Sequence, residues 1–191
     1  MPSSSSLPAS RAAQLIAHLQ LKPHPEGGWY REVFRSASQV APADGRPPRA
    51  ALSSIYFLLE GHQHSCWHKV LSDEVWVYLE GAPLALWLWD APDGQAHCVQ
   101  IGPIGAQAEA TMALPTEPQH VVTAGLWQAA LPLVGDATES FTLAACMVGP
   151  GFDFSDFRMM QADSAEARSL RRMQPGLTHL VPAAHTPKDT Q

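Results

Sequence analysis

The sequence lacks basic runs, long apolar runs and abundant charge, and each of these absences excludes a class of protein. Charged residues make up 16% of the 191 residues and the formal net charge is −6, so nucleic acid is not expected as a partner. The only arginine cluster, at Arg168, Arg171 and Arg172, lies beside Glu166 and indicates a solvated helix face. No apolar run approaches the ~20 residues that a membrane span requires, so no membrane association is expected.

Cysteine is also scarce. Cys66, Cys98 and Cys146 are an odd number, and no C-x-x-C pair is present, so neither a disulfide scaffold nor a zinc ribbon is expected. Residues 1–10, MPSSSSLPAS, have neither the basic region nor the apolar region of a signal peptide. Reduced, buried thiols in a cytoplasmic protein are the simplest interpretation.

The chain does contain enough apolar material for one hydrophobic core, since hydrophobic residues make up 46% of it. We expect residues 1–9 to form a disordered lead. Ser10 is a suitable N-cap for an amphipathic helix, which the proline-containing segment KPHP ends. A single domain is predicted over residues 10–160, followed over residues 161–191 by a short helix and a loose C-terminal tail.

Between Ala51 and Val148 the sequence consists of short apolar runs separated by turn signals, which is typical of an all-β sandwich or barrel. Asp93-Gly94 between two alternating runs is the clearest hairpin signal. No helical pattern interrupts the series, which excludes a parallel α/β fold. The expected strands are SSIYFLL, SCWHKV, EVWVYLE, LALWLWD, AHCVQIG, ATMALP, QHVVTA, WQAALPL and FTLAACMV.

The segment HKVLSDEVWVYLEG holds the residues with the clearest chemical meaning. Strand alternation places Glu74, Trp76 and Tyr78 on one face. If Ser72-Asp73 forms a tight turn, His68 and Glu74 lie on adjacent strands near the same end. A concave sheet then places an imidazole, a carboxylate and large aromatic side chains in one pocket, as a small-molecule site requires.

The same segment follows the order H-x-V-x3-E-x6-G, which is similar to the first sequence motif of the cupins except that Val70 replaces a second histidine. The second cupin motif is altered as well, since Thr123-Ala-Gly-Leu-Trp-Gln128 replaces its proline and its histidine. The sequence as a whole resembles the cupin family DUF985 in five ordered blocks, from about Leu15 to Phe157. These blocks are PHPEGGWYREVFRS, SSIYFLLEG, SCWHKVLSDEVWVYLEG, TAGLWQAA and GPGFDFSDF.

The resemblance implies a fold and an assembly, but no established reaction. It implies a cupin double-stranded β-helix, or jelly-roll barrel, with an N-terminal helix and a short C-terminal helix. It also implies a homodimer, similar in shape to the metal-free sugar-nucleotide 3,5-epimerases. The wider superfamily contains dioxygenases, isomerases, sugar-binding proteins and storage proteins, so fold alone does not assign a function.

A cupin metal site usually presents three histidines and one glutamate. If this chain bound a metal, the ligands would be His68, Glu74 and Gln128, but glutamine is a weak ligand and Val70 is none. We therefore expect no metal and no other cofactor. A metal-dependent oxygenase or lyase with a depleted ligand set remains an alternative, and so does a non-catalytic ligand-binding or sensor protein.

Without a metal, a carboxylate hydrogen-bonded to His68 would fix the tautomer of its imidazole and raise its basicity. The leading hypothesis is a small-molecule-binding cupin that isomerises or epimerises a sugar-like or keto substrate by proton transfer. His68, Glu74 and Tyr78 are the candidate catalytic residues, and Tyr30 or Tyr56 are alternative proton donors. The candidate substrate-binding residues are Tyr30, Arg31, Ser54, Tyr56, Trp76, Gln128, Phe152 and Asp153.

Structural roles compete with these assignments. His68 and Glu74 form, in this second interpretation, only a satisfied polar pair, and Trp76 and Tyr78 belong to the barrel core or a dimer surface. By simple alternation along the strand, Arg31 and Arg35 lie on the same face. If that face lines the barrel mouth, the two guanidinium groups bind an anion; otherwise they are surface residues. Asp153 contacts a ligand or forms an Asx-type turn.

Overall fold

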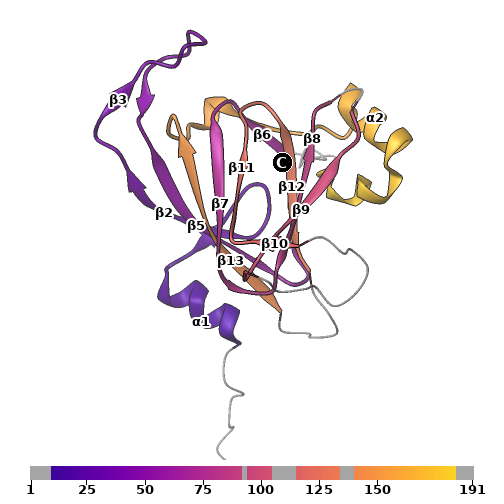
Figure 1. Ribbon diagram of the computed structural model, residues 1–191, viewed down its shortest axis with the longest axis horizontal. Coiled ribbons are helices and arrows are strands. Elements are labelled where there is room, and N and C mark those ends of the chain that lie inside the picture. The colour runs from indigo at the N-terminus through magenta and orange to yellow at the C-terminus, as the bar shows by residue number, and fades with distance from the viewer. Residues whose placement is uncertain (1–9, 92–93, 105–114, 134–139, 184–191) are drawn as a thin grey trace, which may run out of the picture.

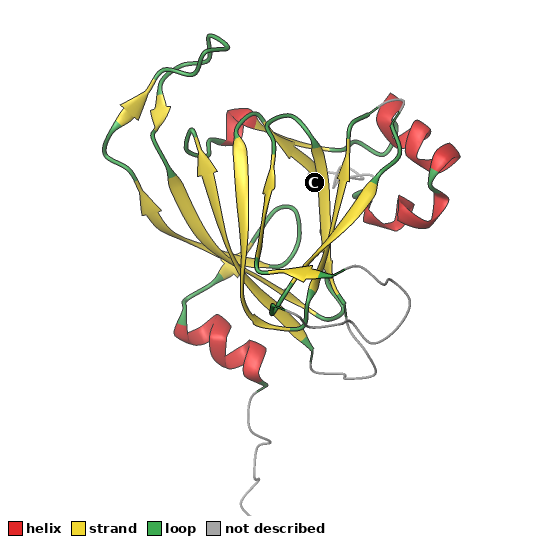
Figure 2. Ribbon diagram, viewed as in Figure 1, coloured by secondary structure: helices red, strands yellow, loops and turns green. Residues whose placement is uncertain are grey.

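The computed structural model describes residues 10–91, 94–104, 115–133 and 140–183. Strands dominate these residues, with the helices at the periphery (Figure 2). Two sheets of six strands each face one another, and a two-stranded ribbon projects from one end (Figure 1). None of the helices in these four ranges is long and apolar enough to cross a membrane.

The first sheet has the order β1-β2-β5-β13-β7-β11, and the second has the order β10-β9-β8-β12-β6-β14. The strands of the first sheet are β1 Lys22–Pro23, β2 Trp29–Arg35, β5 Ser53–Glu60, β7 Asp73–Gly81, β11 Gln119–Val122 and β13 Phe141–Gly149. The strands of the second sheet are β6 Ser65–Val70, β8 Leu84–Trp89, β9 His97–Ile101, β10 Thr116–Glu117, β12 Trp127–Pro132 and β14 Phe157–Met159. The ribbon consists of β3 Gln39–Val40 and β4 Arg49–Ala50.

The chain passes repeatedly from one sheet to the other, from β5 to β6, from β6 to β7 and from β7 to β8. This alternation is that of a double-stranded β-helix, so the predicted all-β jelly roll is confirmed. The hairpin expected at Asp93-Gly94 is confirmed by the antiparallel pairing of β8 with β9, although Asp93 itself lies outside the described residues. Of the expected strand ATMALP, residues 110–114 also lie outside them.

The expected hairpin between β6 and β7 is wrong. β6 pairs with β12 and β14, whereas β7 pairs with β13 and β11, so Ser72 lies at a crossover between the sheets. Alternation of side chains predicts two strands here, but it does not distinguish a tight hairpin from a short crossover. His68 and Glu74 therefore face one another from opposite sheets.

Side chains from both sheets fill the interior between them, with Phe57, Trp76, Leu86 and Ile101 at most 2% exposed. Outside the second sheet, Trp67 and its neighbours pack against α2 (Ala165–Met173) and the 3-10 helix η2 (Pro175–Leu180). Helix α1 (Arg11–His18) packs against the outer face of the first sheet. The helices at the two ends of the domain therefore cover apolar surface on the outside of the sheets.

The predicted N-cap is confirmed, since the Ser10 hydroxyl accepts a hydrogen bond from the Ala13 amide at 3.2 Å. The helical C-terminal segment is confirmed by α2, on which Arg168, Arg171 and Arg172 are exposed. The three cysteines are free thiols. Residues 1–9 and 184–191 lie outside the described residues, and the domain boundaries stay predictions.

Candidate functional site

A cavity of about 420 Å³ lies between the two sheets, a volume typical of sites for small organic ligands. Strands β1, β2, β5, β7 and β13 form one wall and β6 forms the opposite wall. The segment from Phe152 to Phe157 covers part of its mouth. The cavity contains five of the candidate catalytic and substrate-binding residues, namely Tyr30, His68, Glu74, Phe152 and Asp153.

A tight turn brings Glu26 to the strand that carries His68. The His24 amide donates to the Gly28 carbonyl, and the Cys66 amide of β6 donates to the Glu26 carbonyl at 2.8 Å. Gly27 has a φ of +115°, and a Cβ atom there would lie 2.2 Å from the His64 carbonyl oxygen. Only glycine permits this approach, because any side chain would collide with the β6 backbone.

The carboxyl group of Glu26 contacts the imidazole of His68, with 3.3 Å between Oε2 and Nε2. The other imidazole nitrogen, Nδ1, lies 2.8 Å from the Cys66 carbonyl oxygen. Because a carbonyl only accepts, Nδ1 carries the hydrogen of the neutral ring, and Nε2 presents its lone pair to Glu26. Ser65 supports the pair, since its hydroxyl donates to Glu26 Oε1 at 3.1 Å.

A β-bulge in β6 explains the position of Ser65. His68 pairs with Gln128, whereas Ser65 pairs with Ala130, so β6 contains one residue more than β12 over this stretch. The extra residue brings Ser65 to the side of the strand that faces Glu26. Glu26 and His68 are 6% and 2% exposed, so their contact is shielded from water.

Glu74 is held by a separate chain of hydrogen bonds. The Gln128 side-chain amide donates to Glu74 Oε2 at 2.6 Å, and Trp76 Nε1 donates to Gln128 Oε1 at 3.0 Å. All three side chains are buried. The thiol of Cys146, on the neighbouring strand, also hydrogen-bonds Glu74. Glu74 therefore links the two sheets at the cavity wall.

Burial shifts the protonation of these groups toward the neutral forms. Burial raises the pKa of Glu26 to about 8, against a smaller opposite effect of the Ser65 hydrogen bond. It likewise raises the pKa of Glu74 to about 7, although the nearby His68 favours the carboxylate. It lowers the pKa of His24 to about 3, and also lowers the pKa of His68. Two carboxyl groups thus titrate near neutrality beside uncharged imidazoles.

The donor atoms of this site do not fit a metal ion. The Gln128 oxygen already accepts from Trp76, and its NH₂ group, which cannot ligate, is the part directed at Glu74. The Val70 side chain lines the cavity at the position of the second motif histidine. Among the residues that the structure describes, no group of three histidine, cysteine or carboxylate side chains could hold a metal.

Arg31, Ser54 and Tyr56 do not line the cavity. A β-bulge between Glu32 and Phe34 reverses the alternation along β2. Arg31, before the bulge, pairs with Tyr56, whereas Arg35, after the bulge, reaches the cavity. The prediction that Arg31 and Arg35 share a face is wrong for this reason, because an inserted residue leaves no trace in the sequence pattern.

Tyr78 and Trp76 also lie outside the cavity wall. The Tyr78 hydroxyl donates to the Gly81 carbonyl at 2.6 Å, four residues along β7 from Glu74. Trp76 packs edge-on against Phe57 of the cavity lining, with 5.6 Å between ring centroids, and donates a hydrogen bond to Gln128. These placements agree with the core role that competed with catalysis for both residues.

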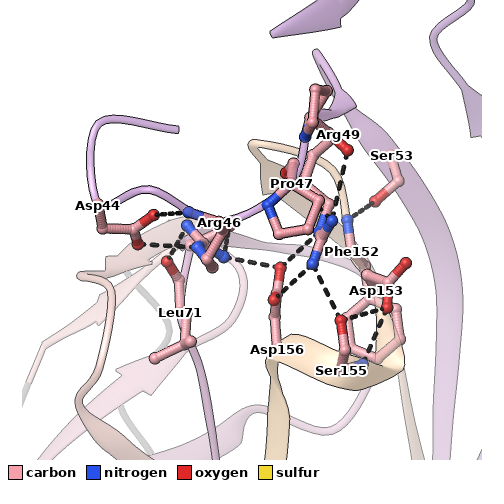
Figure 3. Close-up of polar contacts among 12 residues, drawn as sticks. Asp44, Arg46, Pro47, Arg49, Ser53, Leu71, Phe152, Asp153, Ser155 and Asp156 are labelled. Carbon is pink, nitrogen blue, oxygen red and sulfur yellow. Dashed lines mark hydrogen bonds and ion pairs between the residues drawn. The ribbon is translucent and has the colours of Figure 1, made fainter. Parts of the chain in front are cut away.

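The cavity mouth is formed by a segment that a buried ion-pair cluster holds in place (Figure 3). Arg49 donates to both carboxylate oxygens of Asp156, at 2.8 and 2.9 Å, and Arg46 donates to the same carboxylate at 2.7 Å. Arg46 also donates to the Leu71 carbonyl, which lies between β6 and β7. We call Arg46, Arg49 and Asp156 the mouth latch.

The mouth latch positions the aromatic side chains that follow Gly151. The Phe152 amide donates to Ser53 Oγ at 2.9 Å, and Asp153 caps the 3-10 helix η1 (Phe154–Asp156) by accepting from the Ser155 amide. Asp153 thus adopts the turn role that the sequence suggested while its side chain lies on the cavity lining.

Sequence reasoning missed Glu26 and His24. Both belong to the block PHPEGGW, where the spacing His24-x-Glu26 beside two glycines was the available signal. That signal is weak by itself, because the carboxyl group reaches His68 only through pairing of the turn with β6, which lies 40 residues further along the chain.

Comparisons with known proteins agree with this fold. The family model described as "Cupin superfamily (DUF985)" matches residues 13–160. An uncharacterised protein of Saccharomyces cerevisiae is 26% identical over 166 residues, which cover 82% of this chain and 78% of that protein.

Two solved structures are similar over most of the chain. A hypothetical protein from Leishmania major has a TM-score of 0.72 and 30% identity, and covers 91% of this chain and 99% of its own. A protein of Shewanella oneidensis has a TM-score of 0.71 and 28% identity, and covers 93% of this chain and 99% of its own.

Proposed function

Because the chain belongs to DUF985, a family of the cupin superfamily, we propose that its barrel binds a small carbonyl compound and isomerises it by metal-independent proton transfer. One observation carries this proposal: the buried contact between Glu26 and His68 lies in the same cavity as a second titratable carboxyl group, Glu74. Two carboxyl groups in different environments are a common way to supply an acid and a base at one pH.

Glu74 acts as the general base. Its pKa of about 7 leaves much of it ionised at neutral pH, and Gln128 holds one of its oxygens. Glu26 acts as the general acid, since its pKa of about 8 keeps it protonated. His68 contacts Glu26 through Nε2, which carries no hydrogen in the neutral ring, so this contact favours the protonated form of Glu26.

The step is balanced without a further reactant. Glu74 takes the proton on the carbon next to the carbonyl, and the electron pair of that C–H bond forms a carbon–carbon double bond. The carbonyl π electrons move onto oxygen, which receives the Glu26 proton. Glu74 then delivers its proton to carbon while Glu26 takes one back from oxygen, so both residues recover their starting forms. Delivery to the former carbonyl carbon of a compound with an adjacent hydroxyl, which gives up the proton that Glu26 takes, is an isomerisation, and delivery to the opposite face of a stereocentre is an epimerisation.

Chemistry that needs a tightly bound metal is disfavoured, because the Gln128 oxygen already accepts from Trp76 and the Val70 side chain has no ligand atom. We therefore propose that no metal and no other cofactor takes part. Equilibrium dialysis against Mn²⁺, Fe²⁺, Ni²⁺ and Zn²⁺ tests this independently. Retention of one equivalent through gel filtration, with loss in His68→Ala, would reverse it.

Hydrogen exchange in deuterated water tests the reaction. Keto acids and keto sugars are incubated with the protein, and loss of the proton next to the carbonyl is followed by ¹H NMR. We expect exchange by the wild type and a loss on the order of 10²–10⁴-fold in Glu74→Gln. Glu80→Gln is the matched control, because Glu80 lies on the same strand but pairs with Arg11 at the surface.

The opposite outcome is equally clear. Wild-type exchange no faster than that of Glu74→Gln, for every compound tried, would remove the catalytic proposal. Binding of a compound without exchange would then assign the cavity to a ligand-binding or sensor protein. A cytoplasmic location and a homodimer complete the proposal.

A further inference from the structure

The middle of the cavity offers little to a hydroxylated ligand. Apart from its charged and titratable groups, the cavity is lined by aliphatic side chains and aromatic rings, with Ser53 and Cys146 as the other polar residues. The Ser53 hydroxyl already accepts from the Phe152 amide, which leaves mainly its own hydrogen for a ligand. Buried sugar hydroxyls without partners cost free energy, so this wall favours an apolar ligand body.

The rings stand edge to face around the cavity. His24 contacts Tyr30 with 4.5 Å between ring centroids, and contacts Phe57 and Phe157 at 5.8 and 6.2 Å. Phe152 packs on Phe157 in the same manner at 5.8 Å. Such a wall suits a flat or hydrocarbon group, which gains contact area from the rings without needing hydrogen bonds.

One cation at the mouth has no carboxylate partner. The Arg35 guanidinium is bonded to both oxygens of Glu32 and to the Phe152 carbonyl. Lys22 differs, since its ammonium lies 5.1 Å from the Tyr30 ring centroid and forms no ion pair with any described carboxylate. An unpaired ammonium on a cavity rim is suited to binding an anionic group.

Two rings separate this ammonium from the acid and base. The Lys22 ammonium lies over the Tyr30 ring, and the Tyr30 ring contacts the His24 ring. His24 in turn contacts Glu26, with 3.5 Å between Nδ1 and Oε2. A ligand that joins both ends therefore needs an apolar spacer between its anionic group and its reacting carbonyl. A 2-oxo acid, whose two groups are adjacent, cannot reach both.

From these contacts we propose that the ligand is an oxo acid with a carbonyl at one end, an apolar spacer and a carboxylate at the other, held by Lys22. The proposal rests on the proposed function for the position of the carbonyl, but it concerns affinity rather than turnover. It replaces a sugar-like substrate with a hydrocarbon-bodied one.

Binding of defined probes tests the inference. The probes are straight-chain methyl ketones ending in a carboxylate, from 4-oxopentanoate to 8-oxononanoate, with their methyl esters and fructose 6-phosphate for comparison. Affinities are measured by ligand-observed NMR without any requirement for exchange. We expect the longer acids to bind roughly tenfold more tightly than their esters, as a charge-assisted contact provides.

Lys22 variants supply the controls. Lys22→Met is expected to abolish the preference for acid over ester, and Lys22→Arg to retain it. Lys22 is exposed, so both variants are expected to fold like the wild type. Equal affinity for acids and esters, or tighter binding of fructose 6-phosphate, would overturn the inference while leaving proton transfer intact. Lys22-dependent binding without exchange would instead remove only the catalytic proposal.

Discussion

At the residue scale, the protonation of the buried Glu26 couples to the stability of the fold. Its pKa is about 8 in the folded protein against 4.5 for an unperturbed carboxyl. Between these values the folded state binds more protons than the unfolded state, so rising pH destabilises the protein. Glu26→Gln lacks this effect. The free energy of unfolding of Glu26→Gln, minus that of the wild type, should therefore increase with pH by up to about 1.4 kcal/mol per pH unit.

Urea unfolding at several pH values between 4.5 and 8.5 measures this difference. Other titrating groups near Glu26, namely His24, His68 and Glu74, are present in both proteins and largely cancel in the comparison. A difference that stays constant over the whole range would show that Glu26 ionises normally.

Glu74 and Glu26 together predict the pH dependence of the proposed reaction. The base must be ionised, so the exchange rate should rise as pH passes about 7. The acid must be protonated, so the rate should fall as pH passes about 8. We expect a narrow bell in kcat/KM for exchange, whose limbs belong to the interacting groups jointly. Retention of the alkaline limb in Glu26→Gln would contradict this assignment.

The residues of the motif were visible in the sequence, whereas their partners were not. His68, Glu74 and Gln128 occupy motif positions, and the structure brings all three to one region between the sheets. Glu26 could not be paired with His68 from spacing, because the contact depends on a turn and a strand that are distant in sequence. Local patterns report periodicity, not the tertiary pairing that decides which carboxyl meets which imidazole.

At the element scale, the turn from His24 to Gly28 positions the acid. Gly27→Ala should destabilise the protein and displace Glu26, because it adds a clash with the His64 carbonyl to an unfavourable φ. Gly45→Ala is a matched control, since Gly45 also has a positive φ, of +82°, but has open space around it. A side chain at such a positive φ costs about 1–3 kcal/mol of stability in either variant, before any clash is added.

Chemical denaturation of both variants separates the two effects. The loss in Gly27→Ala should exceed the loss in Gly45→Ala, and exchange should fall only in Gly27→Ala. Equal losses would mean that the close approach of the turn to β6 contributes nothing.

The mouth latch should control the order of the segment from Phe152 to Phe157. Arg49 lowers the pKa of Asp156, so the stabilisation is present above the ordinary pKa of 3.8 and is lost as pH falls. Asp156→Asn should lower the Tm and increase amide hydrogen exchange in this segment. Asp44→Asn is the control, because Asp44 pairs with the same Arg46 at an exposed position. Similar protection in both variants would exclude a role for the latch.

Element types followed from the sequence more readily than their registers did. The cap at Ser10 and the turn signals between strands depend on local chemistry. The bulges in β2 and β6 are not, because an extra residue is inserted only where two strands must pair and curve. The bulge in β2 is the reason that Arg35 does not share a face with Arg31.

At the scale of the whole molecule, the first sheet exposes an apolar outer face beyond the area that α1 covers. One row of paired residues crosses five strands, from Phe34 through Ser54, Met147 and Val75 to Val121. Phe34 is 51% exposed and Val121 is 47% exposed. Exposed apolar side chains on one sheet face are a candidate contact surface, and we expect this face to form the homodimer that the family resemblance implies.

A charge placed on this row should therefore separate the subunits. Under twofold symmetry each substituted residue enters the shared interface of both copies, so one substitution acts twice. We expect wild-type protein at micromolar concentration to sediment at twice its mass of 20.7 kDa, and Val121→Lys to sediment at the monomer mass. Ile104→Lys is the control, because Ile104 is 83% exposed and lies outside the row. A monomeric wild type, or a Val121→Lys dimer as tight as the control, would refute association through this face.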